Sequence, residues 1–441
     1  MSRRIRFSVP LGLYISVPFC RTKCSYCNFA SDVFSKSAYQ NYVARVIDDI
    51  AHAHQLASEL GCALDDIVDS IYLGGGTPSI LGDSELQRIF EAVREHFVVT
   101  PDAEITVECA PGTLAPPLIE TLLQCGVNRV SLGVQSFVDE EAQSVGRLHK
   151  RTTVVDDIAR LRDAGLANMS IDLIAGLPHQ TAESWTFSVS EAIAAGVPHV
   201  SVYMLEVDDD SRLGRELIAG GARYHAHFVP DDEATADFYE QACEMLNAAG
   251  VSQYEISNFA RIETNVRRLP SAAEATFTNN ESRHNMKYWT RQPYLGFGVD
   301  AHSMLVAVRS DVDRPDVGLS QAVRFATPES LDAYLNRAPH TVTPVSAQAA
   351  IEESFFLGLR LNRGLDLERL RKEFDPKLPT GAVAVWETAI QQCLHDGLIE
   401  RQGETLRLTS RGRLLSNEVF ARFLVGEAEE IKVGTGHVNP R

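Results

Sequence analysis

Three cysteines stand close together near the start of the chain, in the segment YISVPFCRTKCSYCNF, at Cys20, Cys24 and Cys27. A structural zinc site wants four closed ligands, so a distant His or Cys would have to complete this set. Three unrelated buried cysteines are a second interpretation, against which the polar loop residues count: Arg21, Lys23 and Ser25. The third is a [4Fe–4S] cluster, in which three protein thiolates leave one iron open to an added ligand.

The residues around this loop predict alternating strands and helices. Such alternation is typical of βαβ units around a parallel sheet, so the predicted fold class is α/β, and six units could close part of a barrel. The strands are predicted at 13–17, 70–73, 104–108, 129–133, 168–173 and 199–205, and the helices at about 37–60, 83–97, 115–125, 152–164 and 181–195.

Polar or glycine residues follow several of the predicted strands. A glycine run, GGGTP, spans 74–78, and Glu108, Gln135 and Asp172 stand at later strand ends. Because the carboxyl ends of parallel barrel strands carry the active site, we expect these residues to face one ligand together with the cysteine loop. A solvated strand-end acid at Glu108 and a helix-capping role for Asp172 are the structural alternatives.

The pairing of CxxxCxxC with GGGTP in a run of βα units resembles the radical S-adenosylmethionine (SAM) superfamily. The resemblance implies a partial (β/α)6 barrel in which Cys20, Cys24 and Cys27 hold a [4Fe–4S] cluster and SAM binds its open iron. It also implies which positions contact SAM: Tyr14, Gly75, Gly76, Thr77, Glu108, Gln135, Arg147 and Asp172. For the glycines the physical sense is that only Gly lets backbone approach a ligand so closely.

Two branches of this superfamily need separating. Oxygen-independent coproporphyrinogen III oxidases carry a fourth cysteine two places after the third and a longer N-terminal segment. Here Phe29 holds the fourth place and only 19 residues precede Cys20, features that resemble the haem chaperone (HemW) branch. That branch bears an HNxxYW motif, matched by His284, Asn285, Tyr288 and Trp289.

By this resemblance His284 is the predicted haem ligand, since a neutral imidazole is a standard axial ligand of haem iron. On a helix Tyr288 shares the face of His284, and Asn285 could orient the ring through a hydrogen bond. A core histidine among aromatic neighbours is an equally open interpretation. His302, in the Gly-rich turn YLGFGVDAHS at 294–303, is a second candidate.

The predicted organisation has four parts: a core barrel over 1–230, a barrel extension with the HNxxYW region over 231–345, a winged-helix-like α+β domain over 346–424, and a flexible tail over 425–441. A mobile loop is predicted at 261–280. Over 346–424 there are 11 Lys and Arg against 11 Asp and Glu, so no basic excess favours DNA.

The chain has a net charge of −18 and five further cysteines scattered singly, and its residue pattern leads us to expect neither a secretory signal nor a membrane-spanning segment. These features favour a cytoplasmic protein without nucleic-acid partners. The resemblance implies haem as cargo and haem-requiring acceptor proteins as partners, respiratory membrane proteins being one class. A homodimer is conceivable, and the alternative function is a radical SAM enzyme acting on a porphyrinogen.

Overall fold

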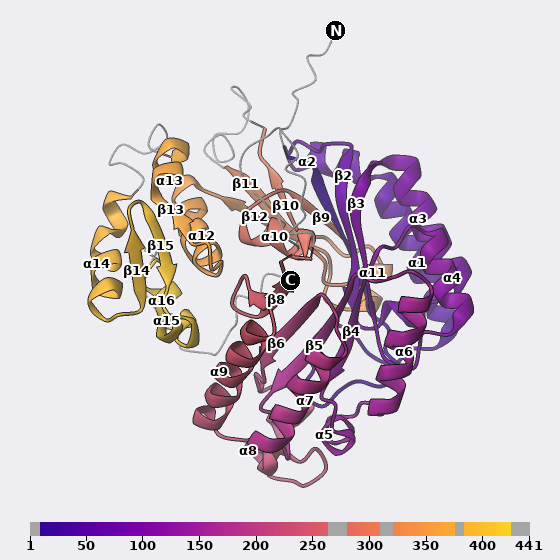
Figure 1. Ribbon diagram of the computed structural model, residues 1–441. Helices are drawn as coiled ribbons and strands as arrows, with labels where there is room; N and C mark the ends of the chain where they lie inside the picture. The colour runs from indigo at the N-terminus through magenta and orange to yellow at the C-terminus, as the bar shows by residue number, and fades with distance from the viewer. Residues whose placement is uncertain (1–8, 263–279, 309–320, 375–382, 425–441) are drawn as a thin grey trace.

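The computed structural model describes residues 9–262, 280–308, 321–374 and 383–424. Within these residues, six parallel strands lie side by side in their order along the chain and curve into part of a barrel (Figure 1). Each strand pairs with its predecessor in sequence. They are β1 (Leu11–Val17), β2 (Ile67–Gly75), β3 (Val98–Cys109), β4 (Arg129–Gln135), β5 (Met169–Ala175) and β6 (His199–Met204). The predicted α/β class and its six core strands are confirmed.

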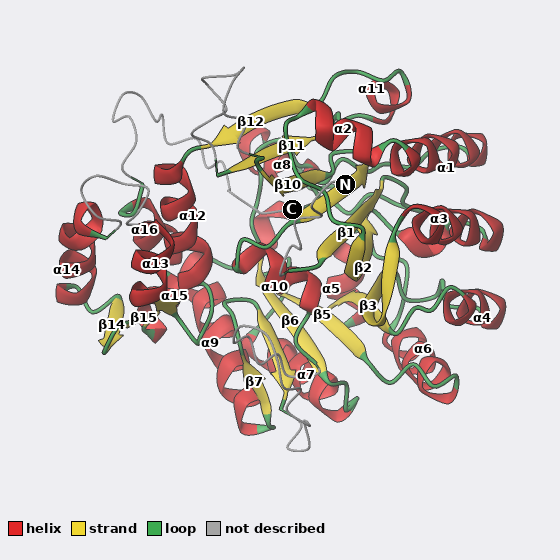
Figure 2. Ribbon diagram, turned by 90° about the horizontal axis from the view of Figure 1, so that it is seen from above, coloured by secondary structure: helices red, strands yellow, loops and turns green. Residues whose placement is uncertain are grey.

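Helices cover the outer face of the six strands (Figures 1 and 2). Their apolar stripes and the outward residues of the strands form one large core, for example Ile71 and Leu73 of β2 against Phe90 of α3. Burying such a side chain contributes about 1.5–3 kcal/mol, and burial holds each helix on the sheet. The helices are α1 (Lys36–Ala51), α2 (Ala53–Glu59), α3 (Asp83–His96), α4 (Pro116–Gln124), α5 (Asp139–Ser144), α6 (Arg151–Asp163), α7 (Ala182–Ala194) and α9 (Asp232–Ala248).

Side chains alternate along each parallel strand, apolar toward the helices and polar toward the barrel interior. On β2 the inward residues are Ser70, Tyr72 and Gly74, and on β3 they are Glu104, Thr106 and Glu108. Closed (β/α)8 barrels fill their interior with branched apolar side chains. A polar interior therefore indicates a barrel that holds a polar ligand.

The sheet extends beyond the six strands on both sides. After β6 come β8 (Asn258–Arg261) and β7 (Val251–Gln253), both antiparallel, and beside β1 lies β9 (Tyr294–Gly298), which is parallel to it. The antiparallel strands β10 (His302–Val306), β11 (Ala322–Ala326) and β12 (Thr341–Val345) follow, with the short helix α11 (Leu331–Leu335). The outermost strands, β12 and β7, do not pair with each other, so the barrel stays open.

The prediction of a Gly-rich turn at 294–303 is wrong for most of its length, because this segment forms β9 and the start of β10. Its glycines serve close backbone packing instead. A Cβ atom on Gly298 would lie 2.3 Å from the carbonyl oxygen of Ser16 in β1, and this glycine has a φ of 98°. Only glycine permits that approach and that conformation at once.

The C-terminal region forms a separate small sheet in the order β13–β15–β14, packed with helices. The predicted hairpin at 398–409 is present, because β14 and β15 pair antiparallel. Phe355, Trp386 and Phe423 centre its core, which continues into Met286 and Trp289 of the barrel extension. The elements are α12 (Ala347–Leu359), β13 (Leu365–Asp366), α13 (Leu367–Phe374), α14 (Glu387–His395), β14 (Ile399–Gln402), β15 (Thr405–Leu408), α15 (Ser410–Leu414) and α16 (Ser416–Ala421).

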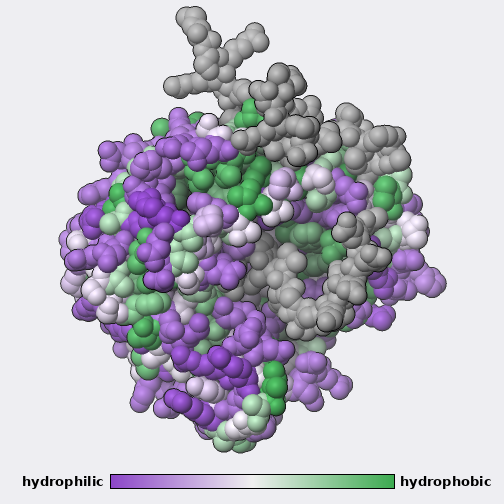
Figure 3. Space-filling view, turned by 180° about the vertical axis from the view of Figure 1, so that it is seen from behind, coloured by the Kyte–Doolittle hydropathy of each residue, from purple (hydrophilic) through white to green (hydrophobic). Residues whose placement is uncertain are grey.

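Most of the predicted loop at 261–280 and the predicted tail at 425–441 lie outside the described residues. No helix among the described residues is both long and apolar enough to span a lipid bilayer. The face seen in Figure 3 is largely hydrophilic, with hydrophobic residues in smaller areas, as the charge of −18 leads us to expect.

Candidate functional site

The cysteine loop lies at the mouth of the barrel, defined here as the end at which the six parallel strands finish. Its two ends are tied together, since the Cys20 N–H donates to the Asp32 carbonyl at 3.0 Å and the Asp32 N–H to Pro18 at 3.0 Å. Its tip is held on both sides: the Ser25 N–H donates to the Val145 carbonyl at 3.1 Å and the Ser25 carbonyl accepts from Leu213 at 2.8 Å. These bonds hold three thiols in a fixed loop.

The glycine turn at the end of β2 packs directly against this loop. The N–H groups of Gly76 and Thr77 each donate at 2.7 Å, to the carbonyls of Val17 and Phe19. A Cβ atom on Gly76 would lie 2.7 Å from the Phe19 carbonyl oxygen and 3.0 Å from the Cys20 sulfur. Gly76 is therefore required for the turn to approach the thiols, and the Thr77 hydroxyl donates to that sulfur at 3.8 Å.

The three thiols are compatible with a cluster, in which they need not converge on one ion. Among the described residues, no three His, Cys, Asp or Glu side chains are arranged to hold one ion, and this includes the three cysteines. Tetrahedral zinc requires such convergence, whereas a cubane takes each thiolate on a different iron. Burial raises the pKa of the Cys20 and Cys27 thiols, so a bound metal would favour their deprotonation.

Two carboxyl groups face each other inside the barrel. Glu108 accepts from the Tyr72 hydroxyl at 2.7 Å, and Asp172 accepts from the Ser131 hydroxyl at 3.1 and 3.2 Å. Burial, opposed by the Tyr72 bond and aided by the charge of Asp172, raises the pKa of Glu108 to about 7. Burial also raises the pKa of Asp172, against its serine hydrogen bonds.

The positive charges of Arg129 and Arg147 only partly offset the burial of Asp172, and no cation acts on Glu108 among the described residues; both carboxyls remain partly accessible within the barrel. A ligand that brings positive charge would favour their ionised forms. The sulfonium and amino groups of SAM are such charges. The predicted SAM residues Glu108 and Asp172 thus fit that ligand chemically.

Arg147 connects the interior to the cysteine loop. One guanidinium nitrogen donates to the Gly133 carbonyl and another approaches the Cys24 sulfur at 3.6 Å. The third, Nε, is buried without a hydrogen-bond partner among the described residues. A Cβ atom on Gly133 would collide with this guanidinium, and neighbouring Gln135 has a φ of 69°, rare for a non-glycine residue. An unused guanidinium N–H suits an anionic group such as a carboxylate.

Tyr14 and Tyr72 lie beneath the carboxyls, with ring centroids 6.1 Å apart, and His284 packs against both at 6.2 and 5.4 Å. The His284 side chain is only 1% exposed. One ring nitrogen contacts the Ser70 hydroxyl at 3.1 Å and the other the Tyr288 hydroxyl at 2.8 Å. Burial lowers the pKa of His284 to about 3, so its imidazole is neutral.

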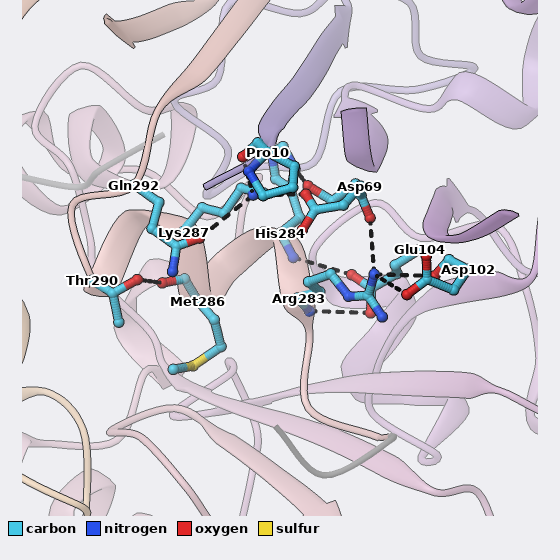
Figure 4. Close-up of polar contacts among 11 residues, drawn as sticks. Pro10, Asp69, Asp102, Glu104, Arg283, His284, Met286, Lys287, Thr290 and Gln292 are labelled. Atoms are coloured by element: carbon cyan, nitrogen blue, oxygen red, sulfur yellow. Dashed lines mark hydrogen bonds and ion pairs between the residues drawn. The ribbon is translucent and has the colours of Figure 1, made fainter. Parts of the chain in front are cut away.

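His284 belongs to the helix α10 (Arg283–Trp289), which closes the floor of the barrel, defined here as the end at which the parallel strands begin (Figure 4). The Glu104 carboxylate accepts from the backbone N–H groups of Arg283 and His284, both at 3.1 Å. Lys287, which is 1% exposed, pairs with Asp69 at 2.7 Å and donates to the Pro10 carbonyl at 2.7 Å. The floor is thus fastened to the first three strands.

The remaining motif residues lie around this helix. Tyr288 shares the face of His284, as predicted, and it is Tyr288 and Ser70, rather than Asn285, that orient the imidazole. Trp289 stacks under the Arg360 guanidinium of the C-terminal region, 4.3 Å from its ring centroid. His302 lies apart from this group, 43% exposed and 3.6 Å from Asp300.

The structure therefore brings all the residues predicted to bind the cluster or SAM to the mouth and upper interior, and it places His284 below them. Our sequence reasoning missed Tyr72 and Ser131, which bind the two carboxyls, and Lys287 and Glu104, which fasten the floor. A signal was present, because polar residues recur at every second position in DSIYLGG, EITVE and RVSLGVQ. The strand pattern alone does not tell which of these polar residues contact the carboxyls or the floor helix.

Comparison with known proteins adds a family relationship. Residues 14–190 match the radical SAM superfamily, a range that includes every residue predicted to bind the cluster or SAM, and residues 345–415 match the HemN C-terminal domain. The chain is 30% identical over 412 residues to the heme chaperone HemW of Bacillus subtilis, which covers 93% of this chain and 98% of that protein. It is 31% identical over 425 residues to the heme chaperone HemW of Mycobacterium tuberculosis (strain H37Rv), covering 94% and 95%.

Among solved structures, coproporphyrinogen III oxidase (HemN) from Escherichia coli is similar with a TM-score of 0.75. The two are 21% identical, and the match covers 95% of this chain and 91% of that one. At so low an identity the likeness concerns the fold alone, and it confirms the predicted barrel with its C-terminal α+β region.

Proposed function

The chain belongs to the heme chaperone HemW family of the radical SAM superfamily, and from this premise we propose that it binds haem and transfers it to haem-requiring acceptor proteins. In this proposal Cys20, Cys24 and Cys27 hold a [4Fe–4S] cluster. The main support for the cluster assignment is the cysteine loop. Its two ends and its tip are held by hydrogen bonds, and the glycine turn packs against its first sulfur.

We assign SAM to the interior above Tyr14. When bound, SAM and the cluster supply one-electron chemistry through the open iron. The chain's own residues would bind and orient the ligand: Glu108 accepts from hydroxyl groups, Asp172 offsets positive charge, and the free Nε of Arg147 donates to an anionic group. Gly75 and Gly76 let the turn approach the end of β1 and the Cys20 sulfur, Thr77 donates to that sulfur, and Gln135 lies with Arg147 beside Gly133.

The test of the cluster is anaerobic reconstitution with iron and sulfide counted. We expect about four of each per chain, and we expect Cys20→Ser, Cys24→Ser or Cys27→Ser to remove most of them. Cys62→Ser is the matched control, because Cys62 is buried elsewhere and its replacement should leave both counts unchanged. Stoichiometric zinc in oxygen-free protein would contradict the assignment.

We propose His284 as a haem ligand, on the condition that one of its ring nitrogens first loses a hydrogen bond. Both ring nitrogens already have partners, so iron could bind only after the imidazole releases Ser70 or Tyr288. His284→Ala should then weaken or shift the Soret band of protein titrated with ferric haem, and Tyr288→Phe should strengthen binding by freeing Nε2. An unchanged spectrum in both variants removes His284 from the haem site.

Transfer is tested with protein loaded with haem and the apo form of a haem-requiring respiratory enzyme. Direct handover predicts a rate that rises with acceptor concentration, whereas simple dissociation gives a rate independent of it.

We place the protein in the cytoplasm, a location supported by its eight cysteines, all in the described part of the chain and none in a disulfide bond.

The rival function is a radical SAM enzyme acting on a porphyrinogen. Phe29, at the place of a fourth cysteine, is 40% exposed beside the loop and offers no thiolate. Anaerobic incubation with SAM and coproporphyrinogen III should give no protoporphyrinogen. Formation of that product at enzymatic turnover would replace the chaperone proposal.

A further inference from the structure

Two histidines meet at the mouth of the barrel, outside the site described above. His179 follows β5, and His225 precedes the one-turn helix η2 (Ala226–Phe228). Nε2 of His179 and Nδ1 of His225 lie 3.1 Å apart, at hydrogen-bond distance. Both residues have positive φ, 69° and 61°, a conformation that is uncommon for a non-glycine residue. Residues in such backbone conformations are often found at functional sites.

The turn that carries His225 is fixed from within. The Glu216 carboxylate, on helix α8 (Arg212–Ala219), accepts from the backbone N–H groups of Arg223, Tyr224 and Ala226 at 2.8–3.1 Å. Although desolvation opposes it, these donors hold the pKa of Glu216 below its ordinary value. The His179 N–H donates to the Phe228 carbonyl at 2.9 Å and so ties this turn to β5.

The hydrogen bond between the rings leaves one nitrogen of each ring for other use. With the proton on Nδ1 of His225, His179 accepts it and Nε2 of His225 keeps a lone pair. That Nε2 has no hydrogen-bond partner among the described residues, and the His225 side chain is partly exposed. Metal-ligating histidines have this arrangement: one nitrogen hydrogen-bonded to an orienting group, the other free for the metal.

An exposed aromatic ring lies against both histidines. The Phe228 ring stacks on His179 with centroids 4.2 Å apart and stays 57% exposed. Helix α8, which packs on η2, exposes Leu217 and Ile218. An exposed aromatic ring beside an imidazole nitrogen suits a flat apolar macrocycle whose metal takes a nitrogen ligand.

The same α8 also contacts the cysteine loop, because the Arg212 guanidinium donates to the Lys23 carbonyl at 3.1 Å and the Leu213 N–H to Ser25 at 2.8 Å. His225 is therefore joined through one helix to the loop proposed to hold the cluster. By contrast, His284 is buried on the floor with both nitrogens engaged. Of the two, His225 is ready to take a ligand.

We propose that His225 Nε2 binds the iron of haem at the mouth of the barrel, with His179 as the positioning residue for its ring and Phe228 packing against the macrocycle. This inference rests on the proposed function, because it takes haem as the cargo, and it makes His225 the alternative to His284 as the iron ligand. It adds to that function a binding site for the haem.

The test is titration of ferric haem into the full chain, followed by its Soret band and by electron paramagnetic resonance. His225→Asn removes the imidazole but tolerates positive φ. We expect it to abolish the spectrum of imidazole-ligated iron and weaken binding at least about tenfold. His54→Ala, at an exposed histidine far along the chain on α2, is the matched control and should change neither readout.

His179 provides a second, independent readout. His179→Asn leaves an amide oxygen too short to reach Nδ1 of His225, and we expect about tenfold weaker haem binding with a shifted spectrum. His179→Gln returns an acceptor of similar reach and should restore the unaltered spectrum, which a merely structural role would not require. Phe228→Ala should weaken affinity while the ligand signature stays.

The failures are distinguishable. A ligated-haem spectrum that survives His225→Asn overturns this site and leaves the chaperone proposal standing. Absence of any Soret band from the unaltered chain overturns the chaperone proposal and this site with it. Equal spectra for His179→Asn and His179→Gln overturn the positioning role.

Discussion

The floor and the mouth of the barrel contain the same types of polar residue, but these residues differ in how completely they are paired. At the floor each charged or titratable group has its partners: Lys287 has Asp69, Glu104 has two backbone N–H groups, and the neutral His284 has two hydroxyls. At the mouth and upper interior, Arg147 Nε has no hydrogen-bond partner within the described parts of the chain, and burial raises the pKa of Glu108 and Asp172.

The difference distinguishes structural from ligand-binding polar groups. Buried polar groups are normally hydrogen-bonded, so an incomplete set within a well-packed fold indicates a missing partner. The floor holds α10 against the strands, and the mouth leaves its groups available for a ligand. Four predictions test this contrast, beginning with the largest effect.

Asp69→Ala should destabilise the protein most. It removes the anion paired with Lys287, whose ammonium is buried and would keep only the Pro10 carbonyl and a distant Gln292. Breaking a buried ion pair from one side costs about 3–5 kcal/mol. The free energy of unfolding from urea denaturation measures it, with Glu368→Ala as control, because the Glu368–Lys372 pair is exposed. An equal effect of both variants would show that the buried Asp69–Lys287 pair contributes no more to stability than an exposed pair.

Glu108→Gln should affect the ligand and not the fold. The amide cannot accept from hydroxyl groups as a carboxylate does, and a hydrogen bond to a charged group contributes about 1.5–3 kcal/mol, or roughly ten- to a hundredfold in SAM affinity. Stability at pH 8 should hold or rise, because a buried charge is removed. Anaerobic equilibrium dialysis of reconstituted protein measures the affinity, and an unaltered affinity contradicts the assignment.

Glu104→Gln is the counterpart on the same strand, four residues earlier. Its carboxylate accepts from two N–H groups of α10, and an amide would set one NH2 against a backbone donor. We expect the unfolding free energy to fall by about 1–3 kcal/mol while SAM affinity is unchanged. A loss of SAM affinity equal to that of Glu108→Gln would mean that floor and mouth do not act separately.

The sequence predicted the six parallel strands and their helices, because β-branched runs and amphipathic stretches alternate over the first 205 residues. It also nominated the residues that the structure gathers at the mouth, since strand ends are readable as soon as strands are. The local sequence pattern could not show that residues 294–298 pair with β1. Several glycines in a short segment predict a turn, and their role in close packing becomes visible only when the neighbouring strand is known.

Pairs between distant segments were equally hidden. Lys287 and Asp69 are 218 positions apart, and nothing in either neighbourhood announces the partner. The His179–His225 contact is similar, since each histidine alone reads as a loop residue. The HNxxYW motif indicated a histidine and a tyrosine on one face, but not that they would bond to each other.

The smallest effect expected concerns pH. Because the pKa of Glu108 is about 7 in the free protein, SAM that requires the carboxylate should bind about tenfold more weakly at pH 6 than at pH 8, the protonated fraction rising as the pH falls. In Glu108→Gln this part of the pH dependence should vanish. His284, whose pKa is about 3, stays neutral throughout that interval, so His284→Phe should leave the slope of affinity against pH as it was. The measurement is the SAM dissociation constant at four pH values for the three proteins. A slope that follows His284 instead of Glu108 would assign the titrating group to the floor and reverse the contrast between the two ends.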